Sequence, residues 1–266
     1  MLSARLSAVS VNPSKMATFD TSFLGGSLLG RLSFRPGTVP DKPALPAGRH
    51  DLGIASERDA VLIVPDGLQP GVPVALLVMF HGAGGSADKV LPFLIDHACQ
   101  RGFLLLLPQS QFPTWDLVVG GNGPDLERLD KALHEVASCF SINPFYLGFA
   151  GFSDGGSYAL SAGVTNGDVV SHVIAFSAGF MSVFQQNGLP RIFIAHGLQD
   201  EQLPIETSAR PHVAKLKAAG YDVTSLEFRG PHHIEPPVVA LAIDFFLKPT
   251  AQPQQVMPRS SNRSCL

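Results

Sequence analysis

Short, almost uniformly apolar runs recur along this chain and are separated by longer segments with a helical pattern. The runs are partly β-branched and bounded by turn residues, which predicts strands buried on both faces of a sheet. They lie at residues 60–64, 72–80, 103–107, 145–150, 172–176, 191–195 and 223–228. Two further short strands are predicted at 30–34 and 50–54, joined by a proline-rich loop, and we expect these early strands to enter the sheet antiparallel.

Helices are predicted between most of these strands. They fit residues 87–100, 125–139, 157–164, 205–219 and 236–247. The clearest is 125–139, in which one apolar stripe is formed by Leu126, Leu129, Leu133 and Val136. Strands that alternate with helices form βαβ units, so we expect the α/β class, with a mainly parallel central sheet and helices on both faces. In such sheets the chemistry lies at the carboxyl ends of the strands.

The composition is that of an ordinary globular protein, with 266 residues, 45% hydrophobic and 15% charged. This length allows a large core. The net charge of −3 and the lack of a basic segment give no reason to expect nucleic-acid binding. No apolar run reaches about 18 residues, so we expect no transmembrane helix. The scattered histidines show no ligand spacing and no nucleotide-binding glycine motif is present, so neither a metal nor a cofactor is expected.

The two ends of the chain differ from the rest. We expect residues 1–27 to form a flexible leader, 28–248 to form one domain and 249–266 to be a disordered polar tail. Residues 1–19 hold basic residues and serines but no acid, as organelle transit peptides do, although a plain polar leader fits equally well.

The compartment is predicted from three weak signals. The three cysteines, Cys99, Cys139 and Cys265, show neither disulfide nor metal spacing, which favours a reducing compartment. We therefore expect a cytoplasmic protein, with a mitochondrion or chloroplast as the alternative through residues 1–19. The C-terminal Ser-Cys-Leu departs from the peroxisomal S-K-L signal because it lacks the central basic residue.

The segment Gly151-Phe152-Ser153-Asp154-Gly155-Gly156 joins an apolar run to a helical segment rich in small residues. This order predicts a strand, a sharp turn and a helix, with Ser153 at the turn. A G-x-S-x-G turn of this kind holds its serine in a strained conformation above the sheet. The glycines are needed because a Cβ would collide with the neighbouring strand or helix. The alternative is a glycine-rich turn with an inert serine.

A serine hydroxyl is a good nucleophile only when a base removes its proton, and the base is a histidine oriented by a carboxylate. In a strand–turn–helix site of this kind the order along the chain is serine, acid, histidine. Asp200 follows a late strand, and Glu201 competes with it. We favour Asp200 because it lies nearer the strand end. His232 and His233 follow the last predicted strand, and chemistry alone does not separate them.

An oxyanion that forms on the substrate needs backbone N–H donors. One donor is expected from Asp154, the residue after the nucleophile. The other should come from the loop His81-Gly82-Ala83-Gly84-Gly85, where we favour the amide of Ala83. The glycines of this loop let the backbone approach a substrate closely. The alternative is a flexible turn with no role in binding.

The loop between the strands predicted at 172–176 and 191–195 has only about 14 residues. It is too short to hold a cap domain, so we expect no large cap and an open cleft. Several large apolar residues lie in loops on this side of the predicted sheet and are candidates for an acyl pocket: Phe112, Trp115, Phe180, Met181 and Phe184. Packing in the core or on the surface is the alternative for each.

The chain resembles the α/β-hydrolases, and within them the serine esterases of the phospholipase/carboxylesterase type. The resemblance covers about residues 28–248 and lies in the segments 80–85, 151–156, 196–200 and 230–237. It implies Ser153, Asp200 and a histidine as catalytic residues, and the amides of Ala83 and Asp154 as the oxyanion hole. By the family's pattern, His233 resembles the catalytic histidine more than His232 does. The loop after His81 departs from many members of the family, so no acyl preference is carried over.

Together these features predict a serine hydrolase that cleaves carboxylic esters or thioesters through an acyl-enzyme, with a small-molecule ester as substrate. Two alternatives remain. One is a non-catalytic, hydrolase-like protein that binds a small molecule. The other is a serine peptidase that uses the same residues.

Overall fold

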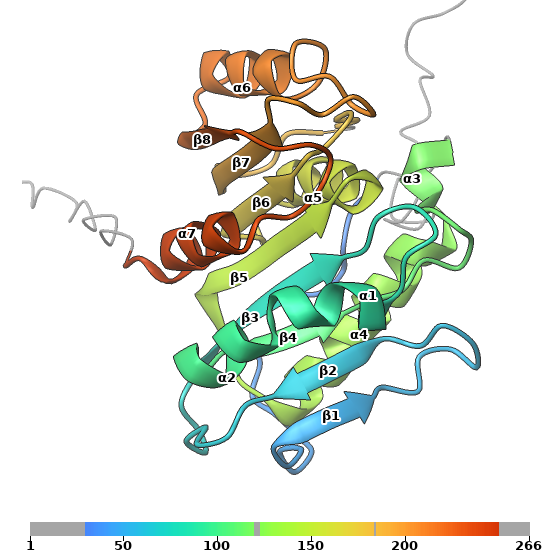
Figure 1. The fold of residues 1–266 in the computed structure, drawn as a ribbon. Helices are drawn as coiled ribbons and strands as arrows, with labels where there is room; N and C mark the ends of the chain where they lie inside the picture. The colour runs from blue at the N-terminus through green and yellow to red at the C-terminus, as the bar shows by residue number, and fades with distance from the viewer. Residues whose placement is uncertain (1–29, 120–122, 184, 250–266) are drawn as a thin grey trace, which may run out of the picture.

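A computed structural model describes residues 30–119, 123–183 and 185–249 (Figure 1). The predicted leader at 1–27, Phe184 and the chain beyond residue 249 lie outside the described residues. Within these described ranges, eight strands form one sheet in the order β1-β2-β4-β3-β5-β6-β7-β8. They are β1 (Gly48–Asp51), β2 (Val61–Val64), β3 (Val74–Phe80), β4 (Leu104–Leu107), β5 (Ile142–Phe152), β6 (His172–Phe176), β7 (Arg191–Gly197) and β8 (Val223–Phe228).

The sheet is antiparallel at one end and parallel elsewhere. Strand β2 pairs antiparallel with both β1 and β4, whereas every pair from β4 through β3, β5, β6 and β7 to β8 is parallel. The predicted antiparallel start and mainly parallel sheet are therefore confirmed. The pairing of β3 with β5 ends at Phe80 and Gly151, and that of β7 with β8 ends at Gly197 and Phe228. The loops that follow these strands consequently lie at one edge.

Helices cover both faces of the sheet. On one face lie α4 (Pro124–Cys139), α5 (Asp154–Thr165) and α6 (Ala209–Ala218); on the other lie α1 (Ala87–Val90), α2 (Ile95–Arg101) and α7 (Pro236–Leu247). The short α3 (Asp116–Val119) follows β4. Among the described residues, no helix is long and apolar enough to cross a membrane.

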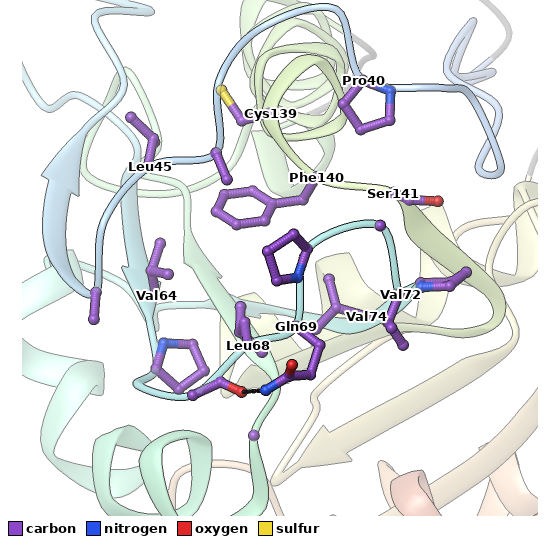
Figure 2. A pocket seen from close by; sticks show the side chains of 18 of the residues that line it. Pro40, Leu45, Val64, Leu68, Gln69, Val72, Val74, Cys139, Phe140 and Ser141 are labelled. Carbon is purple, nitrogen blue, oxygen red and sulfur yellow. Dashed lines mark hydrogen bonds between the residues drawn. The ribbon is translucent and has the colours of Figure 1, made fainter.

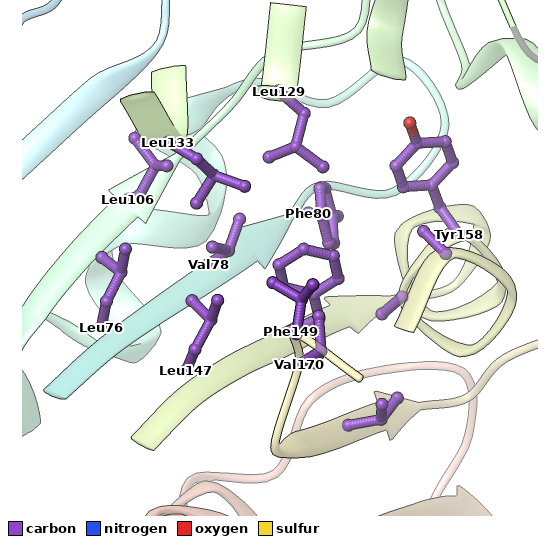
Figure 3. Packing of buried hydrophobic residues seen from close by; sticks show 14 of the residues in the cluster. Leu76, Val78, Phe80, Leu106, Leu129, Leu133, Leu147, Phe149, Tyr158 and Val170 are labelled. Atoms are coloured by element: carbon purple, nitrogen blue, oxygen red, sulfur yellow. The ribbon is translucent and has the colours of Figure 1, made fainter. Parts of the chain in front are cut away.

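Alternate residues of the central strands enter two separate cores. Leu76, Val78 and Phe80 of β3 pack on the α4 and α5 side, together with Leu129 and Tyr158 (Figure 3). Leu77 and Met79 belong to the opposite core, under α1, α2 and α7. A strand whose two faces are both covered must be apolar at every position, which is why β3 reads as a continuous hydrophobic run.

The strand predicted at 30–34 is wrong, because side chains rather than a neighbouring strand take up its backbone amides. Asn166 Oδ1 accepts the amide of Leu32 at 2.9 Å, and Asp130 Oδ1 accepts those of Ser33 and Phe34 at 2.9 Å each. The side chains of Leu32 and Phe34 are buried in the α4 core. The segment is apolar because it packs there, although it lies outside the sheet.

The predicted helix at 87–100 is broken in the structure. After α1 a 3₁₀ turn spans Leu91–Phe93, and α2 begins at Ile95. Pro92 lies in this turn and has no backbone N–H, so it cannot continue an α-helix from the preceding residues. The helix predicted at 205–219 is shorter in the structure, where α6 begins at Ala209 and ends at Ala218.

Candidate active site

Ser153 lies at the junction of β5 and α5, as the glycine-rich motif predicts. Its backbone has φ 55° and ψ −121°, a conformation that non-glycine residues rarely adopt and that is typical of strained functional turns. The turn is held by the Ser153 amide, which donates to Phe176 O at 2.9 Å. A Cβ on Gly151 would overlap the Gly155 carbonyl, and one on Gly155 would overlap the Phe80 carbonyl. The glycines therefore let the turn pack directly against β3.

His232 is the histidine that the structure brings to Ser153. Ser153 Oγ lies 2.9 Å from His232 Nε2, and His232 Nδ1 donates to Asp200 Oδ2 at 2.6 Å. Because Nδ1 carries the proton in that bond, the neutral ring leaves Nε2 free to accept from the serine hydroxyl. Phe152 packs against the His232 ring, with centroids 4.9 Å apart. Hydroxyl, imidazole and carboxylate thus form one continuous hydrogen-bonded chain.

The prediction of His233 as the base is wrong. Its Nε2 lies 2.8 Å from Glu235 Oε1, and its side chain is 39% exposed, against 8% for His232. The loop is fixed against the segment after β7, where the Gln199 amide donates to Gly230 O at 3.0 Å. With the backbone held in this way, the side chain of residue 232 is the one that faces Ser153, while His233 turns toward the start of α7.

Asp200, rather than Glu201, is the carboxylate that lies beside His232. Its Oδ1 accepts the amides of Gln202 and Leu203 at 3.1 and 2.8 Å, and its side chain is fully buried. Glu201 is exposed. Sequence reasoning missed His196, a buried side chain whose Nε2 donates to Leu203 O at 2.7 Å and lies 3.3 Å from Asp200 Oδ2. Its place four residues before Asp200 was the available signal.

The loop after β3 approaches Ser153 closely. A Cβ on Gly82 would lie 3.3 Å from Ser153 Cβ, so the backbone here packs closely against Ser153. The Gly84 amide donates to Pro113 O at 2.6 Å and the Gly85 amide to Gly82 O at 2.9 Å. The Ala83 amide, by contrast, donates to no acceptor among the described residues. It remains available to an oxygen bound beside Ser153.

The second predicted donor is the amide of Asp154, the first residue of α5. The first amides of a helix have no partner within it, and the helix dipole favours negative charge at this end. The Asp154 side chain is held to one side, because Thr114 Oγ1 donates to its Oδ2 at 2.6 Å. The structure therefore brings both predicted oxyanion donors to the loops that flank Ser153.

The predicted acyl-pocket residues do not form one group. Trp115 is fully buried; it stacks on Tyr158 with centroids 4.8 Å apart and donates from Nε1 to His81 O at 2.8 Å. It is therefore part of the core and does not line a pocket. Phe112 is exposed, whereas Phe180 and Met181 are half-buried against the core beside α5.

A pocket of about 500 Å³ lies away from this site (Figure 2). It is lined by the segment that joins β2 to β3, including Leu68 and Val72, and by Phe140 just before β5. These residues precede β3 and β5, so the pocket is at the edge opposite to Ser153. In the described part of the chain, no cluster of three or more histidine, cysteine or acidic side chains is placed to hold a metal ion.

Comparisons with known proteins bear on the fold. No family model matches the chain. Probable feruloyl esterase C of Aspergillus niger is 23% identical over 172 residues, or 62% of this chain and 62% of that protein. Feruloyl esterase C of Emericella nidulans is 24% identical over 157 residues, or 56% and 57% of the two chains. The chain thus matches about three fifths of the length of these curated relatives.

Solved structures resemble it over more of its length. Thermogutta terrifontis esterase 2 phosphorylated by paraoxon has a TM-score of 0.60 at 18% identity, covering 77% of this chain and 96% of that one. The fluorophosphonate-binding serine hydrolase FphF of Staphylococcus aureus has a TM-score of 0.60 at 13% identity, covering 76% and 99%. With this likeness, the strand order and the turn at Ser153, the chain has the α/β-hydrolase fold.

Proposed function

We propose that the protein is a serine hydrolase that cleaves carboxylic esters or thioesters through an acyl-enzyme. The observation that carries this proposal is the hydrogen-bonded chain from Ser153 through His232 to Asp200. Its three members come from different loops, and a purely structural serine would not require a strained backbone at the same position. Because all three side chains of this hydrogen-bonded chain are present, it also argues against a protein that only binds a small molecule.

In the first half of the reaction Ser153 Oγ attacks the substrate carbonyl while His232 Nε2 takes its proton. Asp200 orients the imidazole and stabilises the imidazolium that forms. The amides of Ala83 and Asp154 donate to the oxyanion of the tetrahedral intermediate. When the intermediate collapses, His232 returns the proton to the leaving alcohol or thiol, and the acyl group stays on Ser153.

In the second half water replaces the leaving group. His232 removes a proton from the water, which attacks the acyl carbonyl, and the same two amides hold the second oxyanion. When this intermediate collapses, His232 returns the proton to Ser153 Oγ, so the acid is released and the serine hydroxyl is restored. The described chain between β6 and β7 forms no helix over the site, so we infer an open cleft that admits accessible esters.

The substrate panel follows from the relatives. Two of them are named feruloyl esterases, so the panel includes methyl ferulate beside p-nitrophenyl acetate, butyrate and octanoate. A thioester and a peptide anilide complete it, because the same residues serve thioesterases and peptidases. Turnover of the anilide without the esters would favour the peptidase alternative.

The test replaces Ser153 and His232, two members of the hydrogen-bonded chain. Ser153→Ala and His232→Ala are expected to lose about 10³-fold or more in kcat. His233→Ala is the matched control, since it removes a neighbouring imidazole that does not contact Ser153, and it should keep nearly full activity. A fluorophosphonate should add its mass to the peptide that contains Ser153. Full activity of Ser153→Ala would refute the mechanism.

A further inference from the structure

Arg58 reaches the loop after β3 from a distant part of the chain. It precedes β2, is half-buried, and has φ 51°, a backbone conformation that is uncommon for a side chain of this size. Its Nε donates to Ser110 O at 2.6 Å, and one Nη donates to Gly85 O at 2.8 Å and lies 3.1 Å from His81 Nε2. One guanidinium therefore joins the loop after β3 to the loop after β4.

His81 is held in one tautomer by these contacts. Its Nδ1 donates to Gly82 O at 2.7 Å, so Nε2 has no proton and accepts from the Ser110 amide at 3.1 Å and from Arg58. Burial, with a smaller contribution from the Arg58 charge, lowers the pKa of His81 to about 4. The ring is consequently neutral at neutral pH, with Nδ1 as the donor and Nε2 as the acceptor.

The result is a loop that is anchored through several of its backbone groups. The carbonyls of His81, Gly82 and Gly85 each accept a hydrogen bond, and the amides of Gly84 and Gly85 each donate one. The Ala83 amide, between these anchored groups, has no acceptor among the described residues. An amide held in this way needs no reorganisation when an oxyanion forms, which is the condition for strong electrostatic stabilisation.

We propose that Arg58 is a positioning residue that clamps the loop at residues 81–85 and so aims the Ala83 amide at the oxyanion. The inference rests on the proposed function. Arg58 contacts neither Ser153 nor the other members of the hydrogen-bonded chain. It therefore stabilises the transition state indirectly, by holding the loop that carries the Ala83 amide. Substrate binding in the ground state should be little affected.

The geometry requires arginine. The planar fork places its Nε and Nη donors on two acceptors in different loops, whereas a lysine ammonium is a single point charge on a flexible stem. Loss of one oxyanion donor costs about 10²-fold or more in kcat. Since Arg58 positions the donor without being one, we expect Arg58→Lys and Arg58→Ala to lower kcat by about 10-fold to 100-fold, with KM changed by less than about threefold.

The experiment measures kcat and KM on p-nitrophenyl acetate for both variants, with Arg49→Ala as the matched control. The substitution Arg49→Ala also removes an ion pair, the one between Arg49 and Asp88 on the surface. Arg49 does not contact the loop at 81–85. Urea midpoints establish that each variant is folded under the assay conditions. If Arg58→Ala does not fold, the milder Arg58→Lys decides the result.

Chemical rescue separates positioning from a general structural role. Millimolar guanidinium should raise the kcat of Arg58→Ala about 10-fold. Methylammonium should give this variant no gain, and guanidinium should give no gain to wild type or to Arg49→Ala. Unchanged kcat, a rise in KM alone, or a loss that guanidinium does not restore would overturn the inference. Those results would leave the proposed function intact if Ser153→Ala is inactive. Activity of Ser153→Ala would instead refute the proposed function.

Discussion

The substitution Asp200→Asn tests the proposed mechanism with almost no change in shape. Oδ1 of Asp200 accepts two backbone amides, from Gln202 and Leu203, and Oδ2 accepts the Nδ1 proton of His232. An asparagine keeps its oxygen on the two amides, because a backbone N–H can only donate, whereas the His232 imidazole can move its proton to the other nitrogen. Its NH₂ is then turned toward His232.

The cost follows from the tautomer. An NH₂ group beside His232 Nδ1 needs an acceptor there, so the imidazole proton moves to Nε2. Nε2 is then a donor and cannot take the proton of Ser153. Replacement of the acid in this arrangement lowers kcat by about 10⁴-fold, which corresponds to about 5.5 kcal/mol of transition-state stabilisation. Because the Asp200 side chain is fully buried, water is not positioned to restore the original tautomer.

The assay compares kcat on p-nitrophenyl acetate for Asp200→Asn and for the control Glu201→Gln. The control changes the adjacent exposed carboxylate in the same way but leaves the hydrogen-bonded chain intact, so it should stay within about twofold of wild type. Thermal unfolding should show that both variants are folded. If Asp200→Asn kept more than about a tenth of the wild-type kcat, the assigned role of Asp200 would be refuted.

Three further predictions concern stability, measured by urea unfolding. Gly155→Ala places a Cβ against the Phe80 carbonyl and should cost about 3 kcal/mol. Burial lowers the pKa of His172 to about 4, so the stability that the neutral ring provides above pH 6.5 is lost as the pH falls toward 4; His172→Phe should reduce that acid loss by about 3 kcal/mol. Asp130→Ala leaves the amides of Ser33 and Phe34 without their acceptor and should cost about 1–3 kcal/mol. Variants as stable as wild type, or an unchanged pH dependence for His172→Phe, would contradict these expectations.

Local sequence was sufficient where the signal is local. The buried run from Leu76 to Phe80 predicts a strand because both faces of β3 are covered, and the structure confirms it. The turn at Ser153 was also predictable, since only glycines tolerate the close backbone contacts on either side. The segment at 30–34 misled the prediction because the groups that accept its amides, Asp130 and Asn166, lie about 100 or more residues away in the chain.

The candidate site divides in the same way. Asp200 was preferred to Glu201 because it is nearer to the end of its strand, and the structure places Asp200 beside His232. The choice of His233 was wrong because two adjacent histidines have the same chemistry and differ only in which way the loop turns them. That direction is set by the contact between Gln199 and Gly230, which joins two loops that the sequence does not connect.

By itself, the sequence determined the alternation of strands and helices, the mainly parallel sheet, and the placement of Ser153, Asp200 and the histidine pair after strand ends, because burial periodicity and strand-end placement are properties of short segments. Only the tertiary structure decided that His232 meets Ser153, that Trp115 belongs to the core, and that Arg58 supports the loop beside Ser153. Each of these depends on the packing of loops from distant parts of the chain at one edge of the sheet. Side-chain direction at that edge is a property of the assembled fold.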